Sequence, residues 1–242
     1  MSQRISIEFY TPDLPAPHAF SLQLTAEDQK EATEITFSLS YLDRETCTPE
    51  ELEEDGYTDN DNIQWKGKLG KDWGMILFDP LTYRELSVEE NNHFMHVTFQ
   101  DKKGGKQEGF SSDPRLAYII QELHQAILEA TEKELPLSIR LKELKPDAPI
   151  LDISILGSFL EREAFIIKHS TKKDKKQAIN WSQLKDFMET IYTVDFDPDQ
   201  ALDEKQIQKG MYIEVGEGMW FQIEEEQKKL IETKLAHLLT TT

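Results

Sequence analysis

Hydrophobic residues alternate with polar residues over much of the N-terminal part of the chain. Ile35, Phe37 and Leu39 are separated by single polar residues, and the same period of two recurs over residues 5–9 and 20–24. This period is typical of an antiparallel strand that buries one face. Further strands are predicted over residues 63–69, 73–78, 93–100 and 107–110, with a hairpin turn at residues 102–105.

Capping signals predict where the first two helices begin. Residues 48–51 supply a Thr cap, a proline at the first helical position and a glutamate at the third, and Gly56 would end this short helix. Asp113 and Pro114 open the longest helix, which is predicted to run to about residue 131. Its apolar positions recur at helical spacing: Leu116, Ile119, Ile120, Leu123, Ile127 and Leu128. Glu129 lies off this stripe, so it is expected on the polar face.

The C-terminal part of the chain again begins with strands and ends with helices. Asn180 provides an Asx cap for a helix that reaches about residue 192, and Pro198 to Lys209 is a further candidate helix. The other predicted elements are strands over residues 137–144, 150–156 and 164–168, a hairpin over residues 211–223, and a terminal helix over residues 224–239.

This order predicts the fold class. Runs of strands followed by helices, twice over, indicate an α+β fold with antiparallel sheets and segregated helices, in two closely packed strand-then-helix halves. We expect a strand-rich half over residues 1–135, closed by the long helix, and a second α+β half over residues 136–242 that ends in the C-terminal helix. The two halves form either separate domains or one continuous domain, and no sequence repeat relates them.

Charge changes the picture of what the protein binds. The chain has 46 acidic residues against 27 Lys and Arg, which gives a formal net charge of −19. Such a field repels nucleic-acid phosphates and anionic lipid headgroups, and it favours a basic protein or another cationic partner. The same charge also serves solubility alone.

Cysteine content and hydropathy indicate the compartment. Cys47 is the only cysteine, so no intramolecular disulfide can form, which fits a reducing compartment. The N-terminal residues contain no apolar run typical of a signal peptide, and no window of the sequence approaches the length of a membrane helix. We therefore expect a cytoplasmic protein, with Cys47 as an incidental thiol.

One acidic segment is similar to part of the calcium loop of EF-hand proteins. Asp195, Asp197, Asp199 and Asp203 match the first, third, fifth and ninth positions of that loop. The sixth position lacks glycine and the twelfth lacks the bidentate glutamate, so the segment is a weak metal candidate. The alternative interpretation is that Asp197 caps a helix and Pro198 takes its first position.

The single basic cluster supports a second hypothesis, which is binding of single-stranded nucleic acid. The cluster and its neighbouring aromatic residue are Lys172, Lys173, Lys175, Lys176 and Trp181. The order of strands and helices resembles the layout of single-strand-binding Whirly and PUR-type folds, although no motif residue carries that resemblance. The alternative interpretation is a solvated loop.

Candidate catalytic and metal-binding groups are sparse. His93 and His96 would point to opposite faces of a strand, and His124 has no His or Cys at four-residue spacing. Glu161 and Glu163 follow the end of a predicted strand and are the nearest approach to paired carboxylates. No cofactor, structural metal or catalytic motif is predicted.

Three functional hypotheses remain. The leading one is a non-enzymatic interaction protein whose acidic surface binds a basic partner. The alternatives are a single-strand nucleic-acid binder that uses the basic loop and sheet aromatics, and an enzyme whose catalytic residues are dispersed along the sequence.

Overall fold

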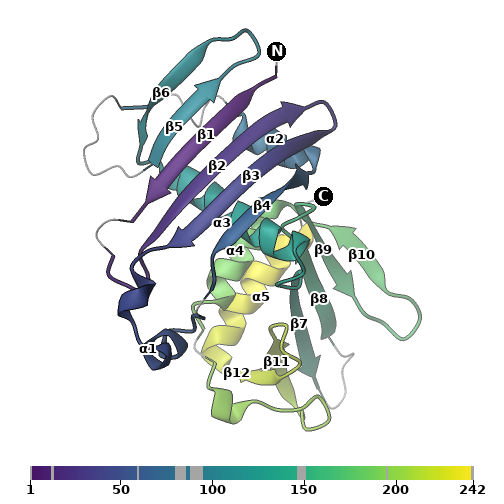
Figure 1. The fold of residues 1–242 in the computed structure, drawn as a ribbon. Coiled ribbons are helices and arrows are strands. Elements are labelled where there is room, and N and C mark those ends of the chain that lie inside the picture. The colour runs from purple at the N-terminus through teal and green to yellow at the C-terminus, as the bar shows by residue number, and fades with distance from the viewer. Residues whose placement is uncertain are drawn as a thin grey trace. The chain divides into compact units, whose positions relative to one another are not determined.

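The computed structural model contains two antiparallel six-stranded sheets accompanied by helices, which confirms the predicted α+β fold (Figure 1). It describes residues 2–11, 14–58, 60–79, 86–87, 95–145, 151–194 and 196–240. The chain divides into two compact units, Met1–Ile127 and Leu128–Thr242. The division falls inside one long helix, a few residues before the predicted boundary between residues 135 and 136.

The first unit has six strands in the order β4-β3-β2-β1-β5-β6. Its elements are β1 (Arg4–Tyr10), β2 (Phe20–Gln29), β3 (Ala32–Tyr41), the 3₁₀ turn η1 (Arg44–Thr46), α1 (Pro49–Glu54), β4 (Ile63–Leu69), α2 (Lys71–Leu77), β5 (Met95–Gln100), β6 (Lys106–Ser111) and α3 (Pro114–Ala130), the last turn of which belongs to the second unit.

The second unit has strands in the order β10-β9-β8-β7-β11-β12. Its elements are β7 (Leu137–Leu144), β8 (Leu151–Ser158), β9 (Glu163–Lys168), β10 (Lys175–Ala178), α4 (Trp181–Ile191), the 3₁₀ turn η3 (Pro198–Gln200), β11 (Gly210–Glu214), β12 (Trp220–Ile223) and α5 (Glu225–Thr240).

The two units share one topology, although no sequence repeat relates them. In each, four strands form a meander, a helix follows the fourth strand, and a hairpin then pairs with the first strand before a final helix. Strands β1–β4 therefore correspond to β7–β10, and the hairpin of β5 and β6 corresponds to that of β11 and β12. A strand order depends on the pattern of buried positions and on turn geometry, so it can repeat while residue identities do not.

Alternation along the strands of the first sheet sets its buried face. Ile35, Phe37 and Leu39 of β3 are buried, and the register pairs Ile35 with Ala26 and Phe37 with Leu24 on β2. Because successive side chains of a strand point to opposite faces, these residues line one apolar face of the sheet.

One predicted strand of the first unit is wrong. Residues 73–78 were expected as a strand, but they lie in and just after helix α2. Trp73 and Leu77, one helical turn apart, are both fully buried. An apolar run of this length fits a strand or a buried helix equally well, and burial at helical spacing decides it here. A side chain on Gly74 would place its Cβ 2.7 Å from Thr33 Oγ1, so the glycine lets α2 lie closely against β3.

Helices α4 and α5 pack against each other and against one face of the second sheet (Figure 1). Asn180 and Gln183 form the predicted capping box at the start of α4. The apolar cluster beneath the helices is made of Ile139, Leu141, Ile153, Ile155, Ala164, Ile166, Ile179, Leu184, Phe187, Ile191, Met211, Ile213, Phe221, Ile223, Ile231, Leu235 and Leu238. The alternate residues of these strands, among them Arg140, Ser154 and Ile167, lie on the opposite face, which we call the outer face.

Two further expectations for the second unit are wrong. Pro198–Lys209 does not form a helix: one 3₁₀ turn ends at Gln200, and Leu202 then forms a bridge with Trp220 beside β12. Residues 175 and 176, expected in a loop, lie in the short edge strand β10. Lysines on a short edge strand oppose pairing with other chains, so the basic cluster is compatible with strand structure.

The polar face predicted for Glu129 is also wrong, because this side chain is buried near the end of α3. Its carboxylate accepts hydrogen bonds from Ser158 Oγ at 2.8 Å, from the backbone nitrogen of Phe159 at 2.9 Å and from that of Leu160 at 3.0 Å. A buried carboxylate is tolerated where its oxygens find donors, and here it holds the turn between β8 and β9.

We predict that Leu123→Ala lowers the free energy of unfolding by about 2–5 kcal/mol, because Leu123 is fully buried and its removal leaves a cavity. Urea denaturation measures the change. Leu135→Ala is the matched control: Leu135 is 85% exposed, so its truncation should change stability by less than about 0.5 kcal/mol. Equal midpoints for wild type and Leu123→Ala would contradict the assignment of this helix face to the core.

Candidate functional site: an acidic lobe around α1

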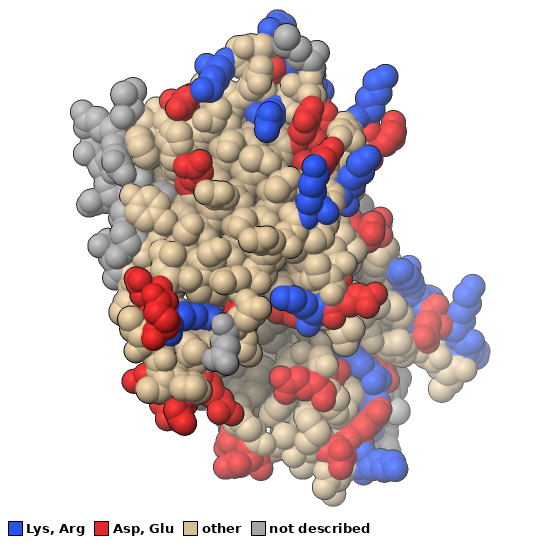
Figure 2. Space-filling view, in the orientation of Figure 1, with Lys and Arg blue, Asp and Glu red and all other residues tan. Residues whose placement is uncertain are grey.

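The densest charge in the sequence lies around α1. Residues 43–61 contain nine acidic residues and one basic residue, a net charge of −8 out of the total of −19. We call this segment the acidic lobe; the structure describes all of it except residue 59. Figure 2 shows acidic side chains gathered over α1 at the lower left. The exposed carboxylates are those of Asp43, Glu45, Glu50, Glu51, Glu53, Glu54 and Asp55.

Local turn chemistry folds the lobe. Asp43 adopts a left-handed conformation (φ 58°) before η1, a conformation that aspartate tolerates better than most residues. Thr48 and Glu51 form the predicted capping box of α1, and Pro49 takes the first helical position. Gly56, at φ 75°, follows the end of the helix as predicted.

Arg44, the lobe's single basic residue, is turned inward. Its guanidinium carbon lies 3.5 Å from the centre of the Tyr41 ring and 4.1 Å from that of Tyr57. Its Nη1 donates to Asp61 Oδ2 at 2.5 Å, and its Nε donates to the carbonyl of Pro17 at 3.1 Å. The side chain is 10% exposed. The planar cation lies over both rings and is hydrogen-bonded at its edges, so it joins the segments on either side of α1. Among the outer carboxylates, that of Asp55 lies 3.7 Å from His18 Nε2.

A cavity of about 360 Å³ lies beside the arginine. It is lined by Tyr41, Arg44, Glu45, Cys47, Pro49, Leu52, Asp61 and Asn62. Arg44 Nη2 is buried and has no hydrogen-bond partner among the described residues. A buried donor without an acceptor is costly, so this atom favours a ligand that brings a carbonyl or carboxylate oxygen.

Asp61 and Tyr41 carry shifted pKa values. Burial raises the pKa of Asp61, but hydrogen bonds from Thr58 and Arg44 outweigh burial and lower it below the usual range of a carboxyl. Burial is also the main reason that the pKa of the Tyr41 hydroxyl is raised. Asp61 is therefore ionised near neutral pH and accepts the hydrogen bond from Arg44, and the Tyr41 hydroxyl is neutral.

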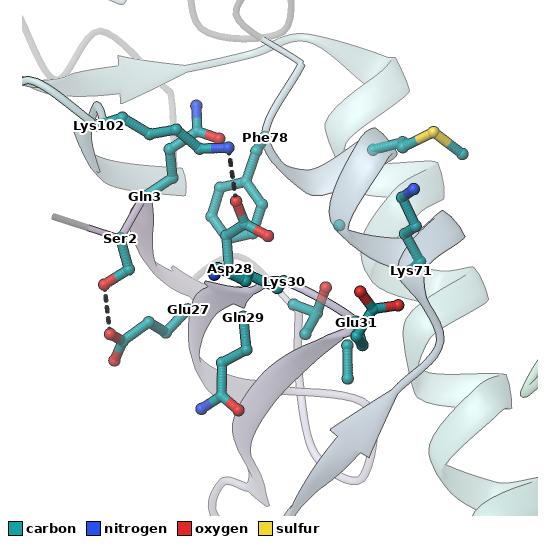
Figure 3. A pocket seen from close by; sticks show the side chains of 14 residues that line it. Ser2, Gln3, Glu27, Asp28, Gln29, Lys30, Glu31, Lys71, Phe78 and Lys102 are labelled. Atoms are coloured by element: carbon teal, nitrogen blue, oxygen red, sulfur yellow. Dashed lines mark hydrogen bonds and ion pairs between the residues drawn. The ribbon is translucent and has the colours of Figure 1, made fainter.

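A larger hollow of about 890 Å³ lies at the turn between β2 and β3 (Figure 3). Lys102 Nζ pairs with Asp28 Oδ2 at 2.9 Å, and Ser2 donates to Glu27. The charged residues around it are Glu27, Asp28, Glu31, Lys30, Lys71 and Lys102. Three acidic and three basic residues line the hollow, so their formal charges cancel and do not select a charged ligand.

The calcium-like segment is used locally by its own backbone. Asp197 Oδ1 accepts from the Asp199 nitrogen at 3.0 Å, and its Oδ2 accepts from Gln200 Nε2 at 2.9 Å. Asp199 and Asp203 are exposed, and Asp195 lies outside the described residues. Within the described ranges, no group of three or more His, Cys, Asp or Glu is arranged to hold a metal ion. The capping interpretation of Asp197 is thus confirmed, although the turn it caps is short.

Lys176 of the basic cluster and Trp181 are on different sides of the second sheet. Lys176 Nζ lies 3.6 Å from the centre of the Phe165 ring on the outer face. Trp181, at the start of α4, packs against the apolar cluster beneath the helices, with its ring 5.0 Å from that of Phe159. Lys172 and Lys173 lie in the turn before β10.

The remaining candidate residues from the sequence form no common site among the described residues. His124 stacks on Phe37, with ring centres 5.8 Å apart, and His96 Nε2 lies 3.6 Å from Glu108 Oε1. His93 lies outside the described residues. Cys47 is partly exposed between η1 and α1. Glu161 and Glu163 are both exposed at the turn between β8 and β9.

Two groups were missed in the sequence. The acidic lobe could have been found by counting charge in a sliding window, because its signal is local. The second group is a hydrogen-bonded chain of Ser154, His169 and Asp174 on the outer face of the second sheet. These residues carry no linear motif, since strand register alone brings them together.

Comparison with known proteins gave no match: no protein family, no curated protein and no solved structure corresponds to the chain. No helix among the described residues is both long and apolar enough to cross a membrane. The functional argument therefore rests on the residues themselves.

We predict that Asp61→Asn makes stability less sensitive to acid. A carboxyl whose pKa is lowered by folding stabilises the protein above its unfolded pKa, and this contribution is lost as the pH falls through the lower folded value. Wild type should thus lose stability below about pH 4, the ordinary range of an aspartate, and the variant should lose less over the same range. Thermal unfolding across that range measures both.

Asp43→Asn is the control for this titration. Asp43 is exposed in the same lobe, and asparagine also tolerates its left-handed backbone conformation. Its acid profile should follow that of wild type. Parallel profiles for wild type and Asp61→Asn would show that the bond to Arg44 does not couple to folding.

Proposed function

We propose that this protein is a cytoplasmic, non-enzymatic interaction protein that uses its acidic lobe to bind a basic segment of a partner protein. The observation that carries the proposal is the row of seven exposed carboxylates around α1, with the one local cation buried beneath them. Lysine and arginine side chains of a partner would pair with these carboxylates at the protein surface.

The cavity beside Arg44 supports a peptide as the ligand. A bound segment has backbone carbonyls in addition to its cationic side chains, and Arg44 Nη2 is a donor that lacks an acceptor. A free metal ion would be repelled by the guanidinium and could not use this donor. A peptide therefore satisfies both the carboxylates and the arginine.

Charged residues elsewhere in the described structure form ion pairs, and this favours the acidic lobe as the binding surface. On the sheets, Lys66 lies 3.3 Å from Glu34 and Lys142 lies 3.4 Å from Asp152. These pairs neutralise charge locally, whereas the only ion pair among the described exposed carboxylates of the lobe is that of Asp55 with His18, at 3.7 Å. The single cysteine, Cys47, supports the cytoplasmic part of the proposal, because it can form no internal disulfide.

The proposal predicts that a fluorescent lysine- and arginine-rich peptide binds the protein and that Glu50→Gln/Glu53→Gln/Glu54→Gln weakens this binding about tenfold. Each exposed ion pair contributes roughly 0.2–1 kcal/mol, and about 1.4 kcal/mol corresponds to a factor of ten in affinity. Fluorescence anisotropy at low and at physiological salt measures the dissociation constant. Glu51 is left unchanged because it belongs to the capping box.

The matched control is Glu161→Gln/Glu217→Gln/Glu226→Gln, which removes three exposed carboxylates from the second unit. Both triple variants have the same net charge, so a general charge effect would weaken them equally. Equal affinities of the two variants would refute binding at the lobe. If the peptide does not bind while single-stranded DNA does, and neutralising Lys172, Lys173, Lys175 and Lys176 abolishes that binding, the nucleic-acid alternative replaces the proposal.

A further inference from the structure

A serine, a histidine and an aspartate form a continuous hydrogen-bonded chain on the outer face of the second sheet. Ser154 Oγ lies 2.8 Å from His169 Nε2, and His169 Nδ1 lies 2.8 Å from Asp174 Oδ2. Both ring nitrogens of the histidine are therefore engaged, one by a hydroxyl and the other by a carboxylate. We call these three residues the serine relay.

The direction of these hydrogen bonds follows from charge. The hydrogen bond from His169 is the main reason that the pKa of Asp174 is lowered, so its carboxylate is ionised near neutral pH. An ionised carboxylate only accepts, so Nδ1 carries the ring proton, and in the neutral ring Nε2 is left as an acceptor. In that form of the ring, Ser154 donates its hydroxyl proton to Nε2. This is the protonation state that a general base needs in order to activate a serine.

Hydrogen bonds to the backbone fix His169 and the turn that carries Asp174. The nitrogen of His169 donates to the carbonyl of Asp152 at 2.8 Å, which extends the pairing of β8 and β9 by one residue. Asp174 Oδ1 accepts from the nitrogen of Ser170 at 3.1 Å, and Ser170 Oγ donates to the carbonyl of Lys173 at 2.7 Å. The turn is thus closed on itself, and it holds the carboxylate against the imidazole.

The sheet face around Ser154 carries basic and apolar side chains. Strand pairing places Arg140 directly opposite Ser154 on β7 and Ile167 opposite it on β9. The Arg140 guanidinium lies 3.6 Å from Asp152 Oδ1 and 5.2 Å from the centre of the Trp220 ring, so it adds a positive charge to this sheet face. Leu156, Phe165 and Ile167 are half-buried on the same face, and they form an apolar surface for a short acyl chain.

We propose that the serine relay is a catalytic site that hydrolyses small esters with short acyl chains, with Ser154 as the nucleophile and His169 as the general base. This activity goes beyond the proposed function, because it uses a different unit of the protein and none of the residues of the acidic lobe.

The reaction proceeds in two balanced steps. Ser154 Oγ forms a bond to the ester carbonyl carbon while its proton passes to His169 Nε2, and Asp174 stabilises the imidazolium. The bond to the leaving alkoxide then breaks, the alkoxide takes that proton, and Ser154 is left acylated. Water, deprotonated by His169, attacks the acyl group, and the proton returns to Ser154. Ester and water are consumed, and acid and alcohol are released.

The first experiment treats the wild-type protein with a fluorophosphonate probe, which forms a covalent bond only with an activated serine. Peptide mass spectrometry should find the adduct on Ser154. An adduct on Ser154 only after denaturation, on another serine only, or on no serine would overturn the proposal. This result does not depend on the folding of any variant.

The second experiment measures hydrolysis of p-nitrophenyl butyrate. Ser154→Ala should lower the rate above the buffer background at least tenfold, whereas Ser138→Ala should leave it unchanged. Ser138 is the matched control, since it lies on the same sheet face and its hydroxyl has no hydrogen bond among the described contacts. An unchanged rate in Ser154→Ala would mean that other surface nucleophiles cleave the ester.

The third experiment tests Asp174 as the positioning residue. Asp174→Asn should lower both the rate and the labelling of Ser154 at least tenfold, because an amide can donate to Nδ1 and favour the wrong tautomer. Asp174→Glu should recover part of the loss, since it restores an acceptor. If Asp174 only held the turn, thermal unfolding would change in Asp174→Asn while the labelling of Ser154 in the folded protein would not, and that result would contradict the relay.

Discussion

Burial of one face of each six-stranded sheet is the constraint on which the rest of this protein depends. Along β8, Ile153 and Ile155 point into the apolar cluster beneath α4 and α5, which forces Asp152 and Ser154 onto the outer face. A shift of the strand register by one residue would turn every side chain of the strand to the opposite face. Burial of the apolar side chains, which stabilises the fold, therefore also fixes the position of the polar groups. Packing of the core of the second unit thus determines which polar side chains lie on its outer face. The same constraint, applied to a different sequence, gives the first unit its matching strand order.

The strands and the capped helices can be predicted from the sequence because their signals are local. Alternation over Ile35, Phe37 and Leu39 survives in β3, and the Thr48 and Asn180 caps begin α1 and α4 as predicted. The mistakes occur where a local signal fits two structures. The apolar run from Trp73 has the length of a strand, and only its packing against β3 makes it a helix. The cap at Asp197 is real, but the residues after Gln200 lack an apolar stripe that could hold a helix against the core.

The candidate sites were harder to predict than the fold, for two different reasons. The acidic lobe is contiguous in the sequence, but charge alone does not reveal that Arg44 turns inward between Tyr41 and Tyr57. That orientation changes the lobe from a partly neutralised loop into a surface of one sign. The serine relay joins Ser154 to His169 across two strands, and their pairing is fixed only when β8 and β9 adopt their register. No spacing of residue types along the chain encodes such a pairing.

The acidic lobe and the turn that carries Asp174 of the serine relay are both short segments that adjoin strands. This arrangement allows a highly charged chain to place a few carboxylates in defined positions. Several charged residues of the second sheet are paired: Lys228 of α5 lies 2.7 Å from Glu143, and Lys142 lies 2.5 Å from Glu204. Paired charges of this kind produce little field at a distance, so they leave the surface potential to whatever is unpaired. Around α1 most exposed charges are carboxylates, and the proposed function assigns to them the attraction of a cationic segment. Beside β9 one aspartate is used instead to fix the tautomer of a histidine. Carboxyl groups would thus serve recognition in the proposed function and proton transfer in the proposed serine relay, and the difference lies in whether a neighbouring side chain is hydrogen-bonded to them.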